Sequence, residues 1–503
     1  MAQQLRNVTI AAPGFAGVNT QDSPIAIGQS FSLIAENAVI DQFGRIGARK
    51  GYEFLTTNPS ELGSGQTESI FEFLDTDGTT TIISAGNNAV YTGTATLVDG
   101  TPSGYSITAN NWKGVSFNGS FFLFQASHDP LYYDGTDFDL VENAGTYTGT
   151  VPLSNEAIAA YGRLWAVSAD KHTIYWSDLL NGFAWTGGSS GSINVDKVWP
   201  DQTDEIIALA AHNNFLIIFG KRQILVYAGA DDPATMQLTD TVVGVGCIAR
   251  DSVQKTGTDL VFLSDSGVRS FNRVIQEKSM PMRDMSKNVR TDLMSIVAEQ
   301  ALPIKSVYNE TEAFYLLTLP SSDTVFCFDM RTFLEDGASR VTTWRDITPR
   351  ALCTKRDGDL LFGFADGIAQ YTGYSDDNVS YRFRYFTSYL DFESPSNLKF
   401  LKKLNITIIG GQNTNAVLSW GYDYSAAYTQ ELFTFGSNNL SEYNISEYNV
   451  STTEYNAGII INEPSVNTGG SGSVVQIGLE ADVNNAPFSI QKIDIHALVG
   501  RIV

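Results

Sequence analysis

The 503-residue chain contains few of the residue types that most often build metal centres and enzyme active sites. It has only four histidines, and no two of them stand at the H-x-x-x-H spacing of a zinc site. No C-x-x-C pair, phosphate-binding G-x-x-x-x-G-K-[ST] loop or dinucleotide-binding G-x-G-x-x-G motif occurs. We therefore expect no metal, no cofactor and no catalytic residue, and we predict that the chain is not an enzyme.

Cysteine and long apolar runs are also scarce. The three cysteines, Cys247, Cys327 and Cys353, are odd in number and widely spaced, which indicates buried free thiols in a protein made in a reducing compartment. No segment approaches the ~18 uninterrupted apolar residues that span a bilayer, and the first residues lack the apolar core of a signal peptide. We therefore expect synthesis in the cytoplasm.

Lys and Arg are fewer than Asp and Glu. The chain has 32 Lys and Arg against 55 Asp and Glu, a net charge of −23. Proteins that hold nucleic acid by its phosphates need clustered Lys and Arg, so this composition argues against tight DNA binding. Two interpretations remain open: the excess acid keeps a large protein soluble, or it forms a surface that does not hold DNA.

The chain does contain a repeated unit. A short apolar run, a polar turn and a second run ending on an aromatic residue recur seven times between about residue 70 and residue 375. β-prone runs that repeat at about this length are typical of four-stranded propeller blades. We predict an all-β chain with a β-propeller over residues 56–375, of about seven blades, with six to eight possible. The aromatic residues are Tyr91, Tyr132, Tyr175, Tyr227, Phe271, Phe328 and Tyr371, spaced by 41, 43, 52, 44, 57 and 43 residues.

The segment before the propeller, residues 1–55, is predicted to form an arm and a hairpin. Residues 1–30 are weakly patterned and indicate an extended arm. Residues 38–40, a turn at 41–44 and residues 45–48 have the pattern of a β-hairpin. Because a propeller commonly closes by pairing a strand from one chain end with the last blade, we expect this hairpin to close the ring.

Two long intervals between the aromatic residues are interpreted as insertions. The first, about 181–200, is rich in Gly and Ser and predicts a surface loop. The second, about 277–303, carries Met285, Val289, Leu293 and Val297 at every fourth position, which predicts an amphipathic helix with Ser286 as a candidate cap. The helix either packs on the flank of the propeller or is offered to a neighbouring subunit.

Residues 376–503 follow a different pattern and predict a separate β-sandwich or jelly-roll-like domain. Tyr381, Phe383 and Tyr385 alternate with Arg382 and Arg384, so that one face of this strand is aromatic and the other cationic.

A stretch within that domain repeats Tyr, Asn, Ser and Glu over residues 441–456. Such a repeat cannot pack a core on both faces, so we expect it to protrude. Tyr443 and Tyr448 are candidate contact residues in this stretch.

Three segments near the start carry a resemblance to a known family. They are residues 13–24 (PGFAGVNTQDSP), 35–41 (AENAVID) and 44–52 (GRIGARKGY). Together they resemble the beginning of tail nozzle proteins of short-tailed bacteriophages, a group that includes packaged-DNA stabilisation proteins and tail tubular B proteins. The order of propeller, late helical insertion and C-terminal β domain is also similar. The resemblance covers most of the chain in architecture and about forty residues in recognisable motif.

The resemblance implies a homo-hexameric ring in a virion tail. This ring would lie below the portal and adaptor proteins, meet the tail fibres, and touch a host outer membrane only through the assembled tail. Double-stranded DNA would pass through its lumen without sequence-specific binding, and the ring would help to retain the packaged genome. An acidic lumen would repel DNA weakly and let it slide, so we expect Asp and Glu to dominate the surface that faces the lumen.

In such an assembly the cationic cluster Arg45, Arg49 and Lys50 is a candidate subunit or adaptor contact; the alternative is a solvated flank of the hairpin. The alternative function is a carbohydrate-binding or glycan-degrading propeller at the tail tip, in which Tyr443 and Tyr448 stack on sugars.

Overall fold

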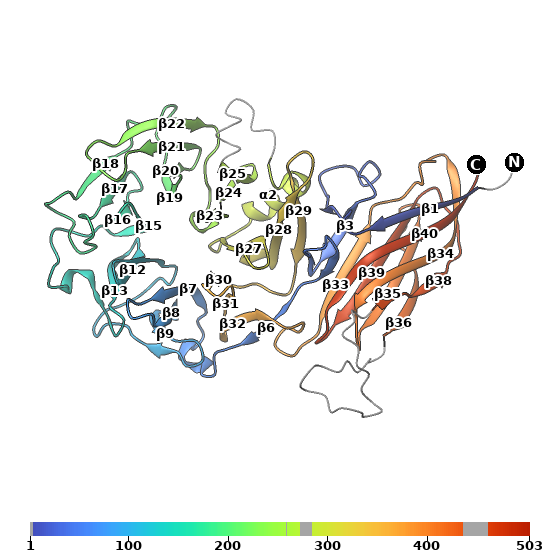
Figure 1. Ribbon diagram of the computed structural model, residues 1–503, viewed down its shortest axis with the longest axis horizontal. Helices are drawn as coiled ribbons and strands as arrows, with labels where there is room; N and C mark the ends of the chain where they lie inside the picture. The colour runs from blue at the N-terminus through green and yellow to red at the C-terminus, as the bar shows by residue number, and fades with distance from the viewer. Residues whose placement is uncertain (1–3, 258, 272–283, 436–460, 503) are drawn as a thin grey trace.

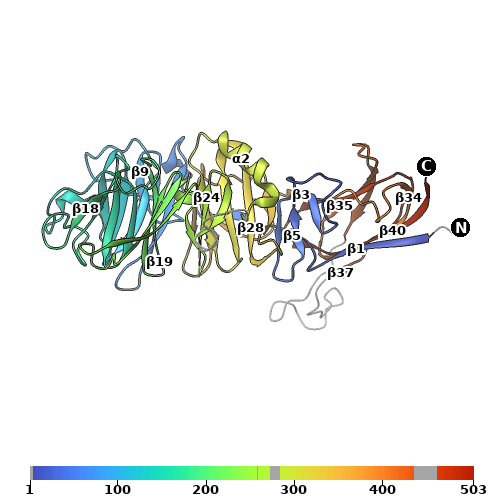
Figure 2. The same ribbon diagram turned by 90° about the horizontal axis from the view of Figure 1, so that it is seen from above.

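The computed structural model of the chain contains a disc of small radial sheets and, beside it, a sandwich of two larger sheets (Figures 1 and 2). It describes residues 4–257, 259–271, 284–435 and 461–502. Both chain ends lie at the end of the sandwich that is farthest from the disc. None of the helices formed by these residues is long and apolar enough to cross a bilayer.

The disc consists of six separate sheets and the first four strands of a ten-stranded sheet. We number these seven blades in chain order. Blades 1 to 3 are β7 (Thr67–Leu74), β8 (Thr80–Gly86), β9 (Ala89–Thr92) and β10 (Val98–Asp99); β11 (Lys113–Phe117), β12 (Ser120–Gln125), β13 (His128–Tyr133) and β14 (Phe138–Leu140); and β15 (Ser154–Ala160), β16 (Arg163–Ser168), β17 (Thr173–Trp176) and β18 (Gly191–Asn194).

Blades 4 to 7 complete the disc. They are β19 (Ile206–His212), β20 (Phe215–Gly220), β21 (Gln223–Ala228) and β22 (Gln237–Val243); β23 (Gln254–Lys255), β24 (Leu260–Ser264) and β25 (Gly267–Ser270); β26 (Lys305–Asn309), β27 (Phe314–Leu319), β28 (Thr324–Phe333) and β29 (Ser339–Trp344); and β30 (Ala351–Thr354), β31 (Leu360–Phe364), β32 (Gly367–Thr372) and β6 (Gly51–Phe54).

The first strands of the blades form a closed ring around a central channel. Contacts run from β7 to β11, β15 and β19, on to the 3₁₀ turn η3 (Arg250–Ser252) that precedes β23, and through β26 and β30 back to β7. The aromatic residue of each repeat lies in or directly after the third strand of its blade. The second strands are almost wholly buried because blades cover both of their faces, which is why they appear in the sequence as continuous apolar runs. The predicted propeller is therefore confirmed.

Blade 7 is completed by β6, a strand from the other end of the chain. It pairs antiparallel with β32, and Tyr52 lies opposite Tyr371. The predicted hairpin exists as β4 (Ala38–Ile40) and β5 (Ile46–Ala48), but β5 pairs with a strand of the sandwich, β40 (Phe488–Ile502). The strand after the hairpin closes the ring, because the chain enters the propeller only at residue 51.

The sandwich is built from both ends of the chain. One sheet continues from blade 6 through β2 (Gly17–Val18), β3 (Phe31–Glu36), β33 (Tyr381–Thr387), β39 (Val475–Val483), β35 (Asn415–Tyr422) and β36 (Thr429–Thr434). The other contains β1 (Gln4–Ala11), β4, β5, β34 (Asn397–Gly410), β37 (Ile461–Asn462), β38 (Ser465–Asn467) and β40. Residues expected to form a free arm thus supply strand β1, which pairs with β40 over eight residues. The predicted alternation in β33 holds, with Tyr381, Phe383 and Tyr385 buried and Arg382 exposed.

The two predicted insertions differ in character. The interval 181–200 contains β18, the outer strand of blade 3, and buries Trp185 and Trp199, so it is a blade element more than a free loop. The second interval contains helix α2 (Arg290–Ala298), preceded by the 3₁₀ turn η4 (Lys287–Val289). Leu293 is fully buried in the core that links the propeller to the sandwich. Ser286 stands at the start of η4, but its hydroxyl accepts a hydrogen bond from the backbone N–H of Val268 and does not cap the turn.

The ten-stranded sheet crosses from the propeller to the sandwich without interruption. Strand β29 of blade 6 pairs in parallel with β2 and β3, and β3 pairs with β33. Gly17 is required at this crossing because a Cβ atom there would lie 2.6 Å from the carbonyl oxygen of Val341. The backbone hydrogen bonds of one sheet therefore join the two domains.

A buried ion pair joins the two covalent connections between the domains. Arg49 is wholly buried and donates two hydrogen bonds to Asp376, of 2.7 and 2.6 Å. Its guanidinium lies 4.2 Å from the ring centre of Tyr381, and its Nε donates to Asn37. Burial would lower the pKa of Arg49, but the hydrogen bonds and charge of Asp376 outweigh it and raise the pKa. Since Arg49 precedes β6 and Asp376 precedes β33, the pair fixes both crossings of the chain.

We expect Arg49→Met to lower the free energy of unfolding by about 3–5 kcal/mol, because it leaves the largely buried Asp376 carboxylate without its cation. Urea unfolding followed by circular dichroism measures the change. Lys171→Met is the matched control, since Lys171 and Glu205 form an exposed pair whose loss costs about 0–1 kcal/mol. Equal effects of the two substitutions would contradict a structural role of the buried pair.

Candidate functional site in the propeller channel

Three of the inner strands carry a β-bulge near their first residue. The pairing register shifts between Thr67 and Ser69 in β7, between residues 154 and 156 in β15, and between residues 206 and 208 in β19. Glu68, Asn155 and Ile207 are the extra residues. A bulge re-aims a side chain, and bulges are common next to functional sites. The strands thus present selected side chains at the same end of the channel.

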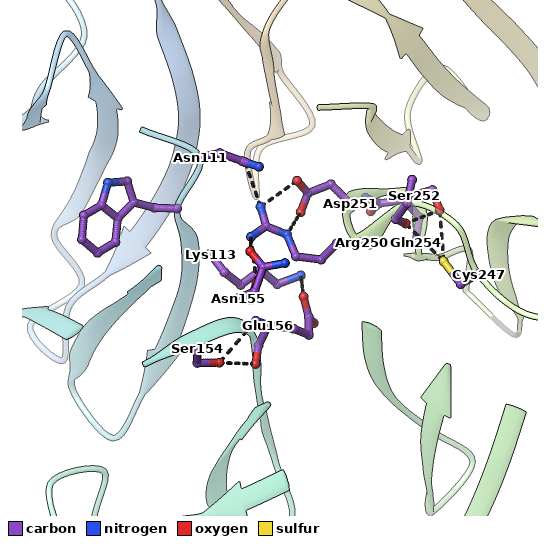
Figure 3. Close-up of polar contacts among 12 residues, drawn as sticks. Asn111, Lys113, Ser154, Asn155, Glu156, Cys247, Arg250, Asp251, Ser252 and Gln254 are labelled. Carbon is purple, nitrogen blue, oxygen red and sulfur yellow. Dashed lines mark hydrogen bonds and ion pairs between the residues drawn. The ribbon is translucent and has the colours of Figure 1, made fainter. Parts of the chain in front are cut away.

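Arg250 in η3 connects opposite sides of the channel (Figure 3). Its guanidinium donates to the carbonyl oxygen of Asn155 at 2.7 Å and to Oδ1 of Asn111 at 2.8 Å. It also makes two hydrogen bonds, of 2.9 and 2.8 Å, to the carboxylate of Asp251. Asn111 precedes the inner strand of blade 2 and Asn155 belongs to blade 3, whereas Arg250 belongs to blade 5. Hydrogen bonds between blades that are not neighbours in the ring must cross the channel.

Lys305, the first residue of β26, extends this network to blade 6. Its ammonium donates to Oδ1 of Asn111 at 2.5 Å and to Asp251 at 2.8 Å. Burial would raise the pKa of Asp251, but Arg250 and Lys305 outweigh it and hold that pKa well below its usual range. Burial lowers the pKa of Lys305, and Asp251 offsets part of that effect. Asp251 is therefore the anion that holds two cations together in the middle of the ring.

Glu156 lies next to this network and is poorly solvated. Its side chain is 2% exposed, and no hydrogen bond from the described residues reaches either carboxylate oxygen. The ammonium of Lys113 lies 3.2 Å away. Burial raises the pKa of Glu156, and Lys113 and Arg250 offset this only in part. Ser154 stabilises the local bulge, because its hydroxyl donates to the carbonyl oxygen of Glu156 at 2.7 Å.

The charges at this end of the channel balance. Lys113, Arg250 and Lys305 supply three positive groups, and Glu68, Glu156 and Asp251 supply three negative groups. The whole chain carries a net charge of −23. The acidic surplus is thus carried by other parts of the molecule, and the channel network is neutral when all six groups are ionised.

The network separates two chambers of the channel. The larger, about 500 Å³, lies between the inner strands of blades 1, 2, 5, 6 and 7, and the smaller, about 350 Å³, lies toward the chain that follows α2. Asp251 lines both chambers and so forms part of the wall between them.

The opposite pKa shifts of Glu156 and Asp251 are a pattern that also occurs in acid–base active sites. A catalytic pair, however, must reach one substrate. Asp251 lines both chambers, whereas Glu156 is absent from the described walls of either one. The arrangement is suited to holding inner strands of the ring together.

The cysteines belong to no metal-ligand group within the part of the chain that the structure describes. Cys247 and Cys327 are buried, as predicted, and Cys353 is half-buried; all three are free thiols. Burial raises the pKa of Cys247 to about 11 and that of Cys353 to about 12, so both stay protonated at neutral pH. Among the described residues, no three His, Cys, Asp or Glu side chains are grouped so as to hold a metal ion.

The residues predicted to contact other subunits differ in burial and in their partners. Arg49 is internal, which corrects its assignment to a subunit or adaptor contact: a residue with no exposed surface cannot meet another chain. Arg45 pairs with Asp41 at 2.6 Å, and Lys50 pairs with Glu312 at 2.5 Å. Lys50 keeps 40% of its side chain exposed and stays a candidate contact residue. Tyr443 and Tyr448 lie outside the described residues.

Sequence reasoning missed Arg250, Asp251 and Lys305. In the sequence these residues are recognisable only as charged residues directly before β-prone runs at blade starts. Many surface turns have the same pattern, so it does not identify channel residues.

Comparisons with solved structures give matches at low sequence identity and low TM-score. No family model and no curated protein matches the chain. The extracellular domain of a putative one-component system from B. thetaiotaomicron matches with 13% identity and a TM-score of 0.41, over 79% of this chain and 58% of that domain. The WD40 β-propeller domain of Doa1 matches with 12% identity and a TM-score of 0.33, over 61% and 92% of the two chains. The WD40 domain of Neurospora crassa Pan2 matches with 7% identity and a TM-score of 0.35, over 65% and 95%. The assignment of the propeller rests on the strand topology described above.

Substitution of the two channel carboxylates should change stability in opposite directions. Asp251→Asn should cost about 3–5 kcal/mol near neutral pH, because Arg250 and Lys305 lose their shared anion. Glu156→Gln should stabilise the fold by about 1–3 kcal/mol, because it removes a poorly solvated charge and Lys113 can still reach water. Urea unfolding of both variants tests these signs.

The pH dependence separates the two contributions further. The folded-state pKa of Asp251 is lowered, so its contribution is present above the ordinary value of 3.8 and is lost as the pH falls below that value. The folded-state pKa of Glu156 is raised, so the advantage of Glu156→Gln should be smallest near pH 4.5 and grow as the pH rises. Parallel pH profiles of Glu156→Gln and the unsubstituted chain would contradict this assignment.

Proposed function

We propose that the chain is a structural subunit of a short-tailed phage tail nozzle, which forms an oligomeric tube around double-stranded DNA and helps to retain the packaged genome. The observation that carries the proposal is where the family-like segments lie. Residues 13–24, 35–41 and 44–52 include β2, Asn37, the hairpin, Arg49 and the start of β6. These segments build the junction between propeller and sandwich, so the resemblance concerns the part of the chain that sets its architecture.

Asn37 connects three segments at that junction through hydrogen bonds of its side chain. It adopts a positive φ of 52°, and its side chain accepts hydrogen bonds from the backbone N–H of Arg345 and from Nε of Arg49. Its amide group donates to the carbonyl oxygen of Arg382 at 2.9 Å. One side chain thus contacts blade 6, the entry to β6 and strand β33. A subunit in the wall of a tube benefits from domains that cannot rotate against each other.

The charge distribution supports weak interaction with the DNA. Residues 56–200, which form blades 1 to 3, contain fifteen Asp and Glu and four Lys and Arg. Strands β12 to β18 of this segment lie at the end of the propeller farthest from the sandwich (Figure 1). An acidic sector does not form the counterion-releasing contacts that hold duplex DNA. Within the proposal this sector faces the lumen.

Negative-stain microscopy of the purified chain, alone and with a portal–adaptor complex, tests the assembly. We expect rings, with the chain added below the adaptor. Lys50→Glu should weaken ring formation or adaptor binding at the candidate contact, and Lys171→Glu is the control at an exposed site of the propeller. Single subunits in both samples, or turnover of cell-surface glycans by the purified chain, would contradict the proposal.

A mobility-shift assay with duplex DNA tests the role of charge. We expect no retained complex at 50 mM or at 200 mM salt, because a basic contact surface would show as binding at low salt that falls steeply with added salt. Salt-sensitive retention of DNA would contradict a lumen through which DNA slides.

A further inference from the structure

We propose that the larger chamber of the channel binds an organic cation, an alkylammonium or guanidinium group, and that Glu68 is its counter-ion. The inference is independent of the nozzle assignment, because it rests on the interior of a single propeller. Its basis is a half-buried glutamate that lines a cavity and has no ion-pair partner among the described residues.

Glu68 is placed in the chamber by its bulge. It is the extra residue between Thr67 and Ser69, and it belongs to the wall of the 500 Å³ chamber. The hydroxyl of Ser69 donates to the carbonyl oxygen of Asn110 at 2.9 Å and accepts from the N–H of Trp112 at 3.0 Å. These bonds fix β7 next to blade 2 at the level of Asn111. Glu68 therefore lies at the end of the chamber that is closed by the cross-channel network.

The other charged groups of the chamber already have partners. Asp251 is paired with Arg250 and Lys305, and Lys113 with Glu156. Glu72, nearer the opposite mouth, accepts one hydrogen bond of 2.7 Å, from the backbone N–H of Arg356. For Glu68 the described residues supply neither a hydrogen bond to the carboxylate nor a cation. Glu68 is therefore the one carboxylate of the described wall that has neither a hydrogen bond nor a directly paired cation, because the cation in excess at Asp251 lies beyond ion-pair distance of it.

The rest of the wall favours an organic cation over a metal ion. Phe71, Phe121 and Tyr308 line the chamber, and aromatic rings attract alkylammonium and guanidinium groups through cation–π interaction. A hard metal ion needs several oxygen ligands together, and the described residues contain no such group. A volume of about 500 Å³ is within the range of small-molecule sites. The cation is either a free amine or a Lys or Arg side chain of a partner, since both present the same chemistry.

The full chain is titrated with butylguanidinium and butylammonium, and with butanol as the neutral control. Saturation-transfer NMR measures the binding of each compound. We expect saturable binding of both cations with a millimolar Kd, as is usual for ligands of this size, and none for butanol. Glu68→Gln should weaken binding at least tenfold, since a charge-assisted hydrogen bond is lost. Glu142→Gln, at an exposed glutamate outside the chamber, should leave it unchanged within twofold.

Circular dichroism of each variant confirms that the fold is retained. Binding that is insensitive to Glu68→Gln, equal binding of butanol, or no saturation by either cation would overturn the proposal. A third arm compares butylguanidinium with the peptide acetyl-Gly-Arg-Gly-amide, each of which carries one positive charge. Tighter binding of the peptide identifies a partner side chain as the source of the cation, and tighter binding of butylguanidinium identifies a free small cation.

Discussion

The structure depends on one hydrogen-bonded sheet that belongs to two domains. Ten strands run from the channel of the propeller, through blade 6, into one layer of the sandwich. Inter-domain contacts within a chain usually resemble transient interfaces and permit relative motion. Here the contact is made of backbone hydrogen bonds, which hold only while the strands keep their register. Rotation of one domain against the other would break the pairing of β29 with β3.

The ring closure and the buried ion pair follow from the same constraint. Because the sandwich takes strands from both chain ends, the chain crosses the junction once toward β6 and once after β32. Arg49, which is wholly buried, and Asp376, which is largely buried, lie on these two crossings, and each neutralises the other. Tyr381 places its ring against the guanidinium and its hydroxyl on the carbonyl oxygen of Arg49. The strand that closes the propeller is thereby positioned by the sandwich.

The channel shows a second use of buried charge. Arg250 and Lys305 bind groups on the opposite side of the ring and share the carboxylate of Asp251, so the propeller is braced across its centre as well as between neighbouring blades. The cross-channel network also divides the channel into two chambers. Passage of a polymer through the centre of one propeller would require this network to break, so any conduit formed by the chain must lie between subunits.

The sequence by itself determined the propeller, the position of its aromatic residues, the helix near residue 290 and the alternation of β33. These features depend on local periodicity: a strand covered on both faces is apolar throughout, and one covered on a single face alternates. Tertiary structure alone decided that β1 joins β40, that β6 rather than the hairpin closes the ring, and that Arg49 is internal while Lys50 is exposed. Adjacent residues with the same charge carry no sequence signal of which one will be buried. That choice depends on Asp376, which is distant in the sequence and becomes a neighbour only when both ends of the chain meet at the junction.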